Sequence, residues 1–192
     1  MQDYAQQFVE LAINRQALQF GDFTLKSGQK SHFFFHIAAI SDGQGLAQLG
    51  RYYAALIMDK QLSFDMIFGP AYKGIHLACA VAISLATEHG LSVPFAYNRK
   101  EAKTHGEGGN LIGAPLSGNV LIIDDVITKG IASTEAIDYI QAAGATPAGL
   151  VVAVDRQAPH ENGTIAMHLQ DTYHMPVHSL TTLATIQSHH QP

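Results

Sequence analysis

The chain is poor in cysteine, in basic residues and in long apolar stretches. Its 192 residues include a single cysteine, Cys79, which excludes an intrachain disulfide. Eleven Lys and Arg against sixteen Asp and Glu give a formal net charge of −5, which argues against binding to duplex nucleic acid or to an anionic membrane surface. Asp3 and Glu10 interrupt the N-terminus where a targeting signal would be apolar, and no stretch is long enough to span a bilayer. We therefore expect a cytoplasmic protein without nucleic-acid or membrane partners.

Common nucleotide and hydrolase motifs are also absent. The sequence contains no G-x-x-x-x-G-K-[ST] run, no complete G-x-G-x-x-G after a strand and no G-x-S-x-G elbow. Hydrophobic residues make up 47% of the chain and charged residues 14%, which is typical of a globular protein. The length predicts one domain that covers residues 1–192.

The order of the apolar patterns predicts an α/β fold. The first part has an amphipathic helix from Tyr4 that ends near Gly21, short strands around a turn at 26–30, and a helical stripe over 46–56. From Phe64 onward, apolar strands alternate with helices, which predicts a parallel sheet covered on both faces. The strands are expected at 65–68, 93–97, 120–123, 150–154 and 177–180, and the helices at 75–87 and 131–143. The polar, glycine-rich stretch 100–113 is expected to be a long loop.

The run from Val120 to Ser133 combines a strand, two acids, a small polar turn and a helix. Backbone N–H groups at a helix N-terminus bind anions such as phosphate. Asp124 and Asp125 would repel phosphate, so a vicinal diol or hydrated Mg²⁺ suits them better. The run therefore indicates a pocket for ribose 5-phosphate. The alternative is a buried strand whose acids only cap the next helix.

This run resembles the signature with which type I phosphoribosyltransferases bind phosphoribosyl pyrophosphate (PRPP). Four other segments resemble the orotate phosphoribosyltransferases, and the likeness covers nearly the whole chain; the segments are 20–31, 68–74, 98–109 and 154–157. The resemblance implies a central, mostly parallel sheet flanked by helices, a small N-terminal hood and a mobile catalytic loop. It also implies an enzyme that makes orotidine 5′-monophosphate and pyrophosphate from orotate and PRPP in pyrimidine biosynthesis.

The resemblance carries roles onto matching positions. The catalytic set is Lys100, Lys103, His105, Asp124 and Asp125. The orotate-binding set is Lys26, Phe34, Phe35, Thr128 and Arg156. The PRPP-binding set is Lys26, Tyr72, Lys73, Arg99, Lys100, Lys103, His105, Asp124, Asp125, Val126, Ile127, Thr128, Lys129, Gly130, Ile131 and Ala132. It also implies Mg²⁺ that reaches the site with PRPP and water near the two acids, without direct protein ligation, and a homodimer that shares the loop 100–109 between subunits.

The placement of basic residues supports this interpretation independently. Seven of the eleven Lys and Arg fall in these segments, as expected of an acidic protein that holds a polyanionic ligand. They are Lys26, Lys73, Arg99, Lys100, Lys103, Lys129 and Arg156. A solvated surface would explain the lysines at 100 and 103 taken alone.

Two positions depart from the family pattern, where a small residue at 129 and a hydroxyl at 131 are expected. Here they are Lys129 and Ile131. Our hypothesis is that the charge of Lys129 partly replaces the hydrogen bond that Ile131 cannot make to the 5′-phosphate. Two other functions are considered: a PRPP-dependent transferase for another nucleobase, and a regulator that binds PRPP without catalysis.

Overall fold

The computed structural model describes residues 3–24, 30–103 and 109–189, with side chains at all of these except 101–103, 109 and 189. Its centre is a six-stranded sheet in the order β10-β7-β6-β3-β4-β5. Every neighbouring pair is parallel except β4 and β5, which are antiparallel. The strands are β3 (Met66–Gly69), β4 (Phe95–Lys103), β5 (Gly109–Gly113), β6 (Asn119–Ile127), β7 (Thr146–Asp155) and β10 (Val177–Thr182).

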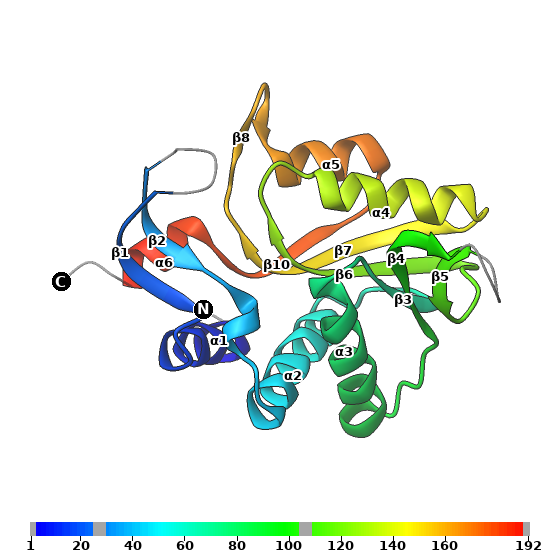
Figure 1. Cartoon of the computed structure of the whole chain (residues 1–192), viewed down its shortest axis with the longest axis horizontal. Coiled ribbons are helices and arrows are strands. Elements are labelled where there is room, and N and C mark those ends of the chain that lie inside the picture. The colour runs from blue at the N-terminus through cyan, green and yellow to red at the C-terminus, as the bar shows by residue number, and fades with distance from the viewer. Residues whose placement is uncertain (1–2, 25–29, 104–108, 190–192) are drawn as a thin grey trace.

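Helices cover both faces of this sheet (Figure 1). One face carries α1 (Asp3–Asn14), α2 (Gly43–Asp59) and α3 (Lys73–His89), and the other carries α4 (Ile131–Ala142) and α5 (Ile165–Tyr173). This arrangement confirms the predicted α/β fold with a mostly parallel sheet.

A small hood stands beside the sheet. It consists of the antiparallel pair β1 (Leu18–Thr24) and β2 (Lys30–Phe35), with α6 (Leu183–His189) next to it in Figure 1. The short 3-10 helix η1 (Ile37–Ala39) leads from the hood into α2, and the hairpin of β8 (Pro159–His160) and β9 (Gly163–Thr164) leads from β7 into α5.

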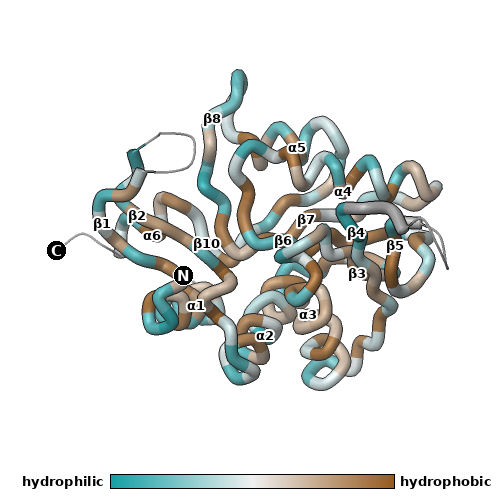
Figure 2. Tube along the Cα trace, viewed as in Figure 1, coloured by the Kyte–Doolittle hydropathy of each residue, from teal (hydrophilic) through white to brown (hydrophobic). Residues whose placement is uncertain are grey.

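Strand β6 is buried on both faces and divides the apolar core in two. Leu121 and Ile123 pack in the core under α2 and α3, whereas Val120 and Ile122 pack in the core under α4. This alternation follows from the two-residue period of a strand. Figure 2 shows the corresponding hydrophobic colour along the central strands.

Several predicted boundaries were wrong. Helix α1 ends at Asn14, and not near Gly21, because Gln16 takes a φ of 56° and the chain turns directly into β1. Strand β6 does not stop at Ile123 but continues through both acids to Ile127, since its backbone stays paired with β7. The expected ends of α3 and α4 are confirmed: Gly90 and Gly144 follow them with φ of 66° and 77°.

The stretch 100–113 is not one long loop. Strand β4 extends to Lys103, and β5, which was not predicted, pairs back on it with Asn98 opposite Leu111. The backbones of β4 and β5 form hydrogen bonds with each other although the residues are polar. The polar, glycine-rich composition had indicated a loop, and this prediction was wrong. Helix α5 was also missed; its amphipathic stripe is short and Thr164 caps its first turn.

The contact between α2 and α3 predicts a sharp difference between two glycines of α2. A Cβ at Gly50 would lie 2.6 Å from the carbonyl oxygen of Ala80, whereas one at Gly43 would meet nothing within 4 Å. We expect Gly50→Ala to lower the free energy of unfolding by about 1–3 kcal/mol through overpacking. Gly43→Ala, the matched control, should be neutral or slightly stabilising. Urea unfolding followed by circular dichroism measures both, and equal stability of the two variants would contradict the close helix contact.

Candidate active site

Two buried carboxylates stand at the carboxyl end of β6. Asp124 and Asp125 are each 6% exposed. The ammonium of Lys73, the first residue of α3, donates to Asp125 Oδ2 at 2.6 Å. The carboxylate of Asp124 accepts a hydrogen bond from the backbone N–H of Asp125 at 2.9 Å. The two acids therefore have different partners although they are neighbours in the chain.

The environment of Asp124 disfavours its charged form. Burial, followed by the nearby charge of Asp125, raises the pKa of Asp124 to about 7, against the opposing effects of the Asp125 N–H and Lys73. A carboxyl group with this pKa changes its protonation near neutrality. A ligand that donates hydrogen bonds, or a cation, would favour the ionised form.

The turn after β6 opens a helix N-terminus to solvent. Gly130 precedes α4 with a φ of 77°, and a side chain there would press on Ile165 of α5. Glycine is therefore required at this turn. The exposed flank consists of Thr128, Lys129, Ile131 and Ala132, while Val126 is half-buried and Ile127 buried. The first N–H groups of α4 have no intrahelical acceptors, and they face a ligand that would approach over this turn.

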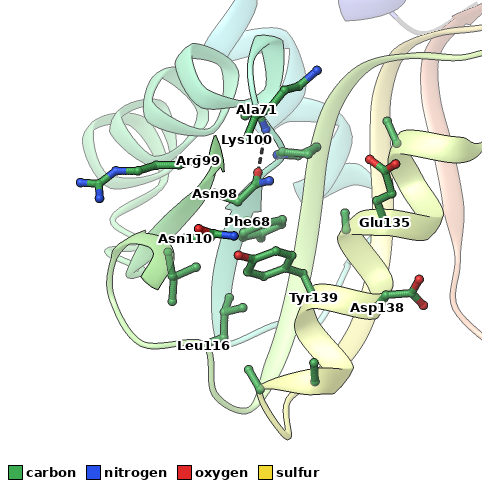
Figure 3. Close-up of a pocket in the computed structure, with 16 residues that line it drawn as sticks. Phe68, Ala71, Asn98, Arg99, Lys100, Asn110, Leu116, Glu135, Asp138 and Tyr139 are labelled. Atoms are coloured by element: carbon green, nitrogen blue, oxygen red, sulfur yellow. Dashed lines mark hydrogen bonds between the residues drawn. The ribbon is translucent and has the colours of Figure 1, made fainter. Parts of the chain in front are cut away.

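A second turn, Gly69 to Gly74, joins β3 to α3. The side-chain amide oxygen of Asn98 accepts a hydrogen bond from the N–H of Ala71 at 2.8 Å (Figure 3). Tyr72 is 67% exposed, and Lys100 Nζ lies 5.1 Å from the centroid of its ring. A Cβ at Gly69 would overlap the carbonyl of Gly74, so the turn is too tight for a side chain there. The turn thus brings an exposed phenol and two lysines, Lys73 and Lys100, to the same edge of the sheet.

The hood cavity, of about 850 Å³, lies between the hood and the turn after β6. It is lined by Lys30, Ser31, His32, Phe33, Thr128, Lys129, Arg156, Gln157, Ala158, Pro159, Ile165, Leu183 and Gln187. Thr128 and Arg156, both predicted to bind orotate, therefore line one cavity together with Lys129, which was predicted to bind PRPP.

Arg156 is held over an aromatic ring in this cavity. Its guanidinium carbon lies 4.8 Å from the ring centroid of Phe33, which is 5% exposed. Burial lowers the pKa of Arg156. Within the described part of the chain no acid forms an ion pair with Arg156. A half-buried cation of this kind is suited to an anionic ligand group.

The aromatic residues of β2 divide as the sequence indicated, with at least one of them in the core. Phe33 is buried, Phe35 is half-buried against Phe8, and Phe34 is 39% exposed between Phe23 and His36. Only Phe34 presents an open aromatic face.

A second hollow, the α4 cavity of about 830 Å³, lies on the other side of the turn after β6 (Figure 3). Its floor includes the nearly parallel rings of Phe68 and Tyr139, and its lining includes Arg99, Lys100 and Ala132. In Figure 3 the guanidinium of Arg99 is directed away from this cavity.

Not every predicted residue can be placed. Lys26 and His105 lie outside the described residues, as does the side chain of Lys103 at the end of β4. Three residues with a direct part in this architecture were missed: Asn98, Phe33 and Tyr53. Asn98 stood inside a segment that matched the family, but nothing in the pattern around Tyr53 distinguished it from an ordinary core residue.

The described residues form neither a metal centre nor a membrane-spanning helix. Among them, no three His, Cys, Asp or Glu side chains form a group that would hold a metal ion. None of the helices described is long and apolar enough to cross a bilayer. Asp124 and Asp125 thus offer two carboxylates, fewer than a cation site made by protein alone would need.

Comparison with known proteins agrees with the geometry. Residues 36–165 match the family model described as the phosphoribosyl transferase domain. Orotate phosphoribosyltransferase of Aeromonas salmonicida is 54% identical over 157 residues, which is 82% of this chain and 72% of that protein. The enzyme of the same name from Yersinia pestis is 49% identical and spans 95% of this chain and 86% of its own length.

Solved structures show the same relation. The crystal structure of orotate phosphoribosyltransferase from Francisella tularensis superposes with a TM-score of 0.84 at 36% identity, over 95% of this chain and 89% of that one. The chain therefore belongs to the phosphoribosyl transferase domain family and, within it, to the orotate phosphoribosyltransferases.

Proposed function

We propose that this protein transfers the 5-phosphoribosyl group of PRPP to orotate, with orotidine 5′-monophosphate and pyrophosphate as products. The observation that carries the proposal is the pair of buried acids at the end of β6, directly before the glycine-capped start of α4, together with Arg156, which lines a cavity with Thr128 and pairs with no acid among the described residues. These groups suit, in that order, a ribose diol, a phosphate and a carboxylate. Orotate and PRPP together carry all three.

In this proposal the turn after β6 holds the 5′-phosphate. The backbone N–H groups of residues 128–132 donate to the phosphate oxygens, and the dipole of α4 favours the negative charge. Lys129 is exposed on this turn and adds a positive charge where Ile131 offers no hydroxyl. The carboxylates of Asp124 and Asp125 accept hydrogen bonds from the ribose hydroxyls.

The pyrophosphate end belongs to cations of two elements. Lys73 and Tyr72 on the turn before α3, with Arg99, Lys100, Lys103 and His105 on and after β4, are proposed to surround the leaving group. When the bond between the anomeric carbon and pyrophosphate breaks, positive charge develops on the ribose and negative charge on the leaving oxygen. Fixed cations beside that oxygen stabilise the transition state more than the bound substrate, which is what lowers a barrier.

The orotate end is proposed to lie in the hood cavity. Arg156 binds the carboxylate, and Thr128, which also lines the cavity, donates to the polar edge of the ring. Phe34, Phe35 and Lys26 are assigned to the ring by the family resemblance, whereas the β2 aromatic that lines the cavity is Phe33. A ring nitrogen of orotate forms the new bond to the anomeric carbon as the bond from that carbon to the pyrophosphate oxygen breaks, and the proton of the ring nitrogen passes to the departing pyrophosphate or to water. Because Phe33 already holds the guanidinium of Arg156, little side-chain freedom is lost when the carboxylate binds.

Magnesium is proposed to reach the site with PRPP. Mg²⁺ usually keeps several waters and is held largely by substrate phosphates, so PRPP and water would carry it near Asp124 and Asp125 without direct ligation by the protein. When bound, the ion neutralises part of the pyrophosphate charge. We also propose a homodimer in which the segment 100–109 is shared between subunits. The exposed side chains of Tyr72 and Ile83, three helical turns apart along α3, offer an apolar surface for the second copy.

Two other functions differ in what they require of Arg156. A transferase for a neutral nucleobase has no carboxylate for this guanidinium to bind. A regulator that only senses PRPP needs no orotate site and no cations that close over the leaving group. In the described part of the chain no acid pairs with Arg156, which lines the hood cavity with Thr128, and this favours orotate over both alternatives.

A direct assay tests the proposal. The full chain is mixed with PRPP, Mg²⁺ and orotate, and the loss of orotate absorbance is followed. We expect turnover that requires all three components. Turnover with hypoxanthine or uracil in place of orotate, or PRPP binding without any turnover, would replace the proposed function by one of the alternatives.

The proposed role of Arg156 predicts a selective loss. Arg156→Lys keeps a charge but removes the planar fork that binds a carboxylate through two hydrogen bonds. A charge-assisted hydrogen bond contributes about 1.5–3 kcal/mol, so kcat/KM for orotate should fall roughly 10- to 100-fold. The KM for PRPP should change little. Arg51→Lys, at an exposed ion pair with Glu88, is the matched control and should behave as the wild type. Equal losses for orotate and PRPP in Arg156→Lys would refute the carboxylate role.

The pKa of Asp124 predicts how stability changes with pH. Because the folded pKa, about 7, lies above the ordinary value near 4, the unfolded chain releases this proton first as pH rises. The folded state therefore loses stability between about pH 4 and 7, and Asp124→Asn removes that loss. In chemical unfolding without ligand, the stability of Asp124→Asn relative to the wild type should rise from about pH 4.5 to about pH 7 and then stay level up to pH 8. Asp138→Asn, an exposed site on α4, corrects for the change in net charge. A difference independent of pH would mean that the Asp124 carboxyl is not destabilised by burial.

A further inference from the structure

One buried hydroxyl lies against the acids, and the mechanism above does not use it. Tyr53 of α2 is 0% exposed, and its hydroxyl donates to the backbone carbonyl oxygen of Asp124 at 2.8 Å. The hydroxyl oxygen of Tyr53 in turn accepts a hydrogen bond from the backbone N–H of Ala153, on the neighbouring strand β7. The hydroxyl thus joins α2 to two central strands at the level where the acids begin.

The peptide group between Asp124 and Asp125 connects this hydroxyl to a carboxylate. Its C=O accepts from Tyr53, while its N–H donates to Oδ1 of Asp124. A peptide group is planar, so fixing its oxygen also fixes the direction of its N–H. A hydrogen bond at the oxygen further polarises the group and strengthens donation at the nitrogen. Tyr53 therefore acts on the Asp124 carboxylate although it does not contact it.

The ring of Tyr53 is held in place by the surrounding apolar core. The ring of Tyr53 packs in the core cluster beneath α2 and α3, together with residues such as Leu49, Ile57 and Ile123. A buried hydroxyl is costly unless it is hydrogen-bonded, and here both its donor and its acceptor functions are used. Phenylalanine would fill the same space, so packing alone does not account for the hydroxyl.

We propose that the hydroxyl of Tyr53 is a positioning group for Asp124, acting through the peptide group that joins the two acids. The inference rests on the proposed function, in which Asp124 binds the ribose of PRPP. It assigns Tyr53 to the PRPP half of the site: Asp124 belongs to the ribose contact, whereas the hood cavity that contains Arg156 lies against other elements. Removal of the hydroxyl should therefore lower kcat/KM for PRPP while it leaves the KM for orotate almost unchanged.

Tyr53→Phe is the test, with Tyr52→Phe on the same helix as the matched control. Tyr53→Phe removes the hydrogen bond to the carbonyl oxygen of Asp124 and with it the constraint on the N–H of Asp125. We therefore expect kcat/KM for PRPP to drop on the order of tenfold, which corresponds to about 1.4 kcal/mol. The KM for orotate at saturating PRPP should change by no more than about twofold, since uncoupled sites contribute independently. The lower limb of the pH profile of kcat/KM for PRPP should move to higher pH, because the weakened N–H donor stabilises the ionised Asp124 less.

A purely structural role for Tyr53 would give a different result. Gly50→Ala, which is expected to destabilise the same helix, supplies the stability-matched comparison. If Tyr53→Phe resembles Gly50→Ala at equal loss of stability, or leaves the PRPP kinetics and pH profile as in the wild type, the positioning role is overturned. If Tyr53→Phe fails to fold, PRPP binding by Tyr53→Met decides in its place.

A failure of the proposed function can be distinguished experimentally from a failure of the positioning role of Tyr53. If the wild type shows no turnover with orotate, titration calorimetry with PRPP and Mg²⁺ compares it with Tyr53→Phe directly. Weaker PRPP binding by the variant alone then supports the positioning role while the orotate assignment falls. A wild type that binds no PRPP overturns both.

Discussion

The structure depends on the burial of two carboxylates at the end of its central strand. Asp124 and Asp125 are held at 6% exposure in the middle of a parallel sheet, where an unpaired charge would be strongly unfavourable. Each acid therefore requires partners from other elements. Lys73 at the start of α3 provides one, and the backbone fixed by Tyr53 of α2 provides the other. The helices that cover one face of the sheet thus also determine the chemistry at its edge.

The opposite side of the site is organised around a cation. Arg156 follows β7, and its guanidinium lies over the ring of Phe33, a residue of the hood. Cation–π contacts of this kind orient an arginine without neutralising it. The hood therefore leaves the positive charge available in the cavity, whereas an acid at the same place would have consumed it. The turn that follows the acids lies in the chain between the two carboxylates and α4, and its residues Thr128 and Lys129 line the same cavity as Arg156.

Much of this could be predicted from the sequence because the governing signals are local. The apolar run from Val120 specifies a strand because a buried strand consists of apolar residues. The glycines at 90 and 144 specify two helix ends because glycine adopts the positive φ that follows a helix. The match of several motifs in order identified the family. The missed features are long-range: β5 forms because β4 offers it an edge, and the hydroxyl of Tyr53 matters only because the sheet places Asp124 beside it. The amino-acid composition contains neither fact, and the roles assigned to the site residues, from Lys26 to Arg156, are predictions.

The separation of the contacting residues along the chain has a consequence for folding. Tyr53 and Asp124 are 71 positions apart, and Lys73 and Asp125 are 52 apart. Contacts of such sequence separation form only when the intervening chain has closed, and their entropy cost falls on the folding transition as a whole. No early fragment can therefore contain a preformed pocket, and a nascent chain acquires its affinity for ligand in the same step in which it acquires its core. A ligand that is present during folding would bind only the native state. A higher substrate concentration in the cell would therefore raise the free energy of unfolding of the protein.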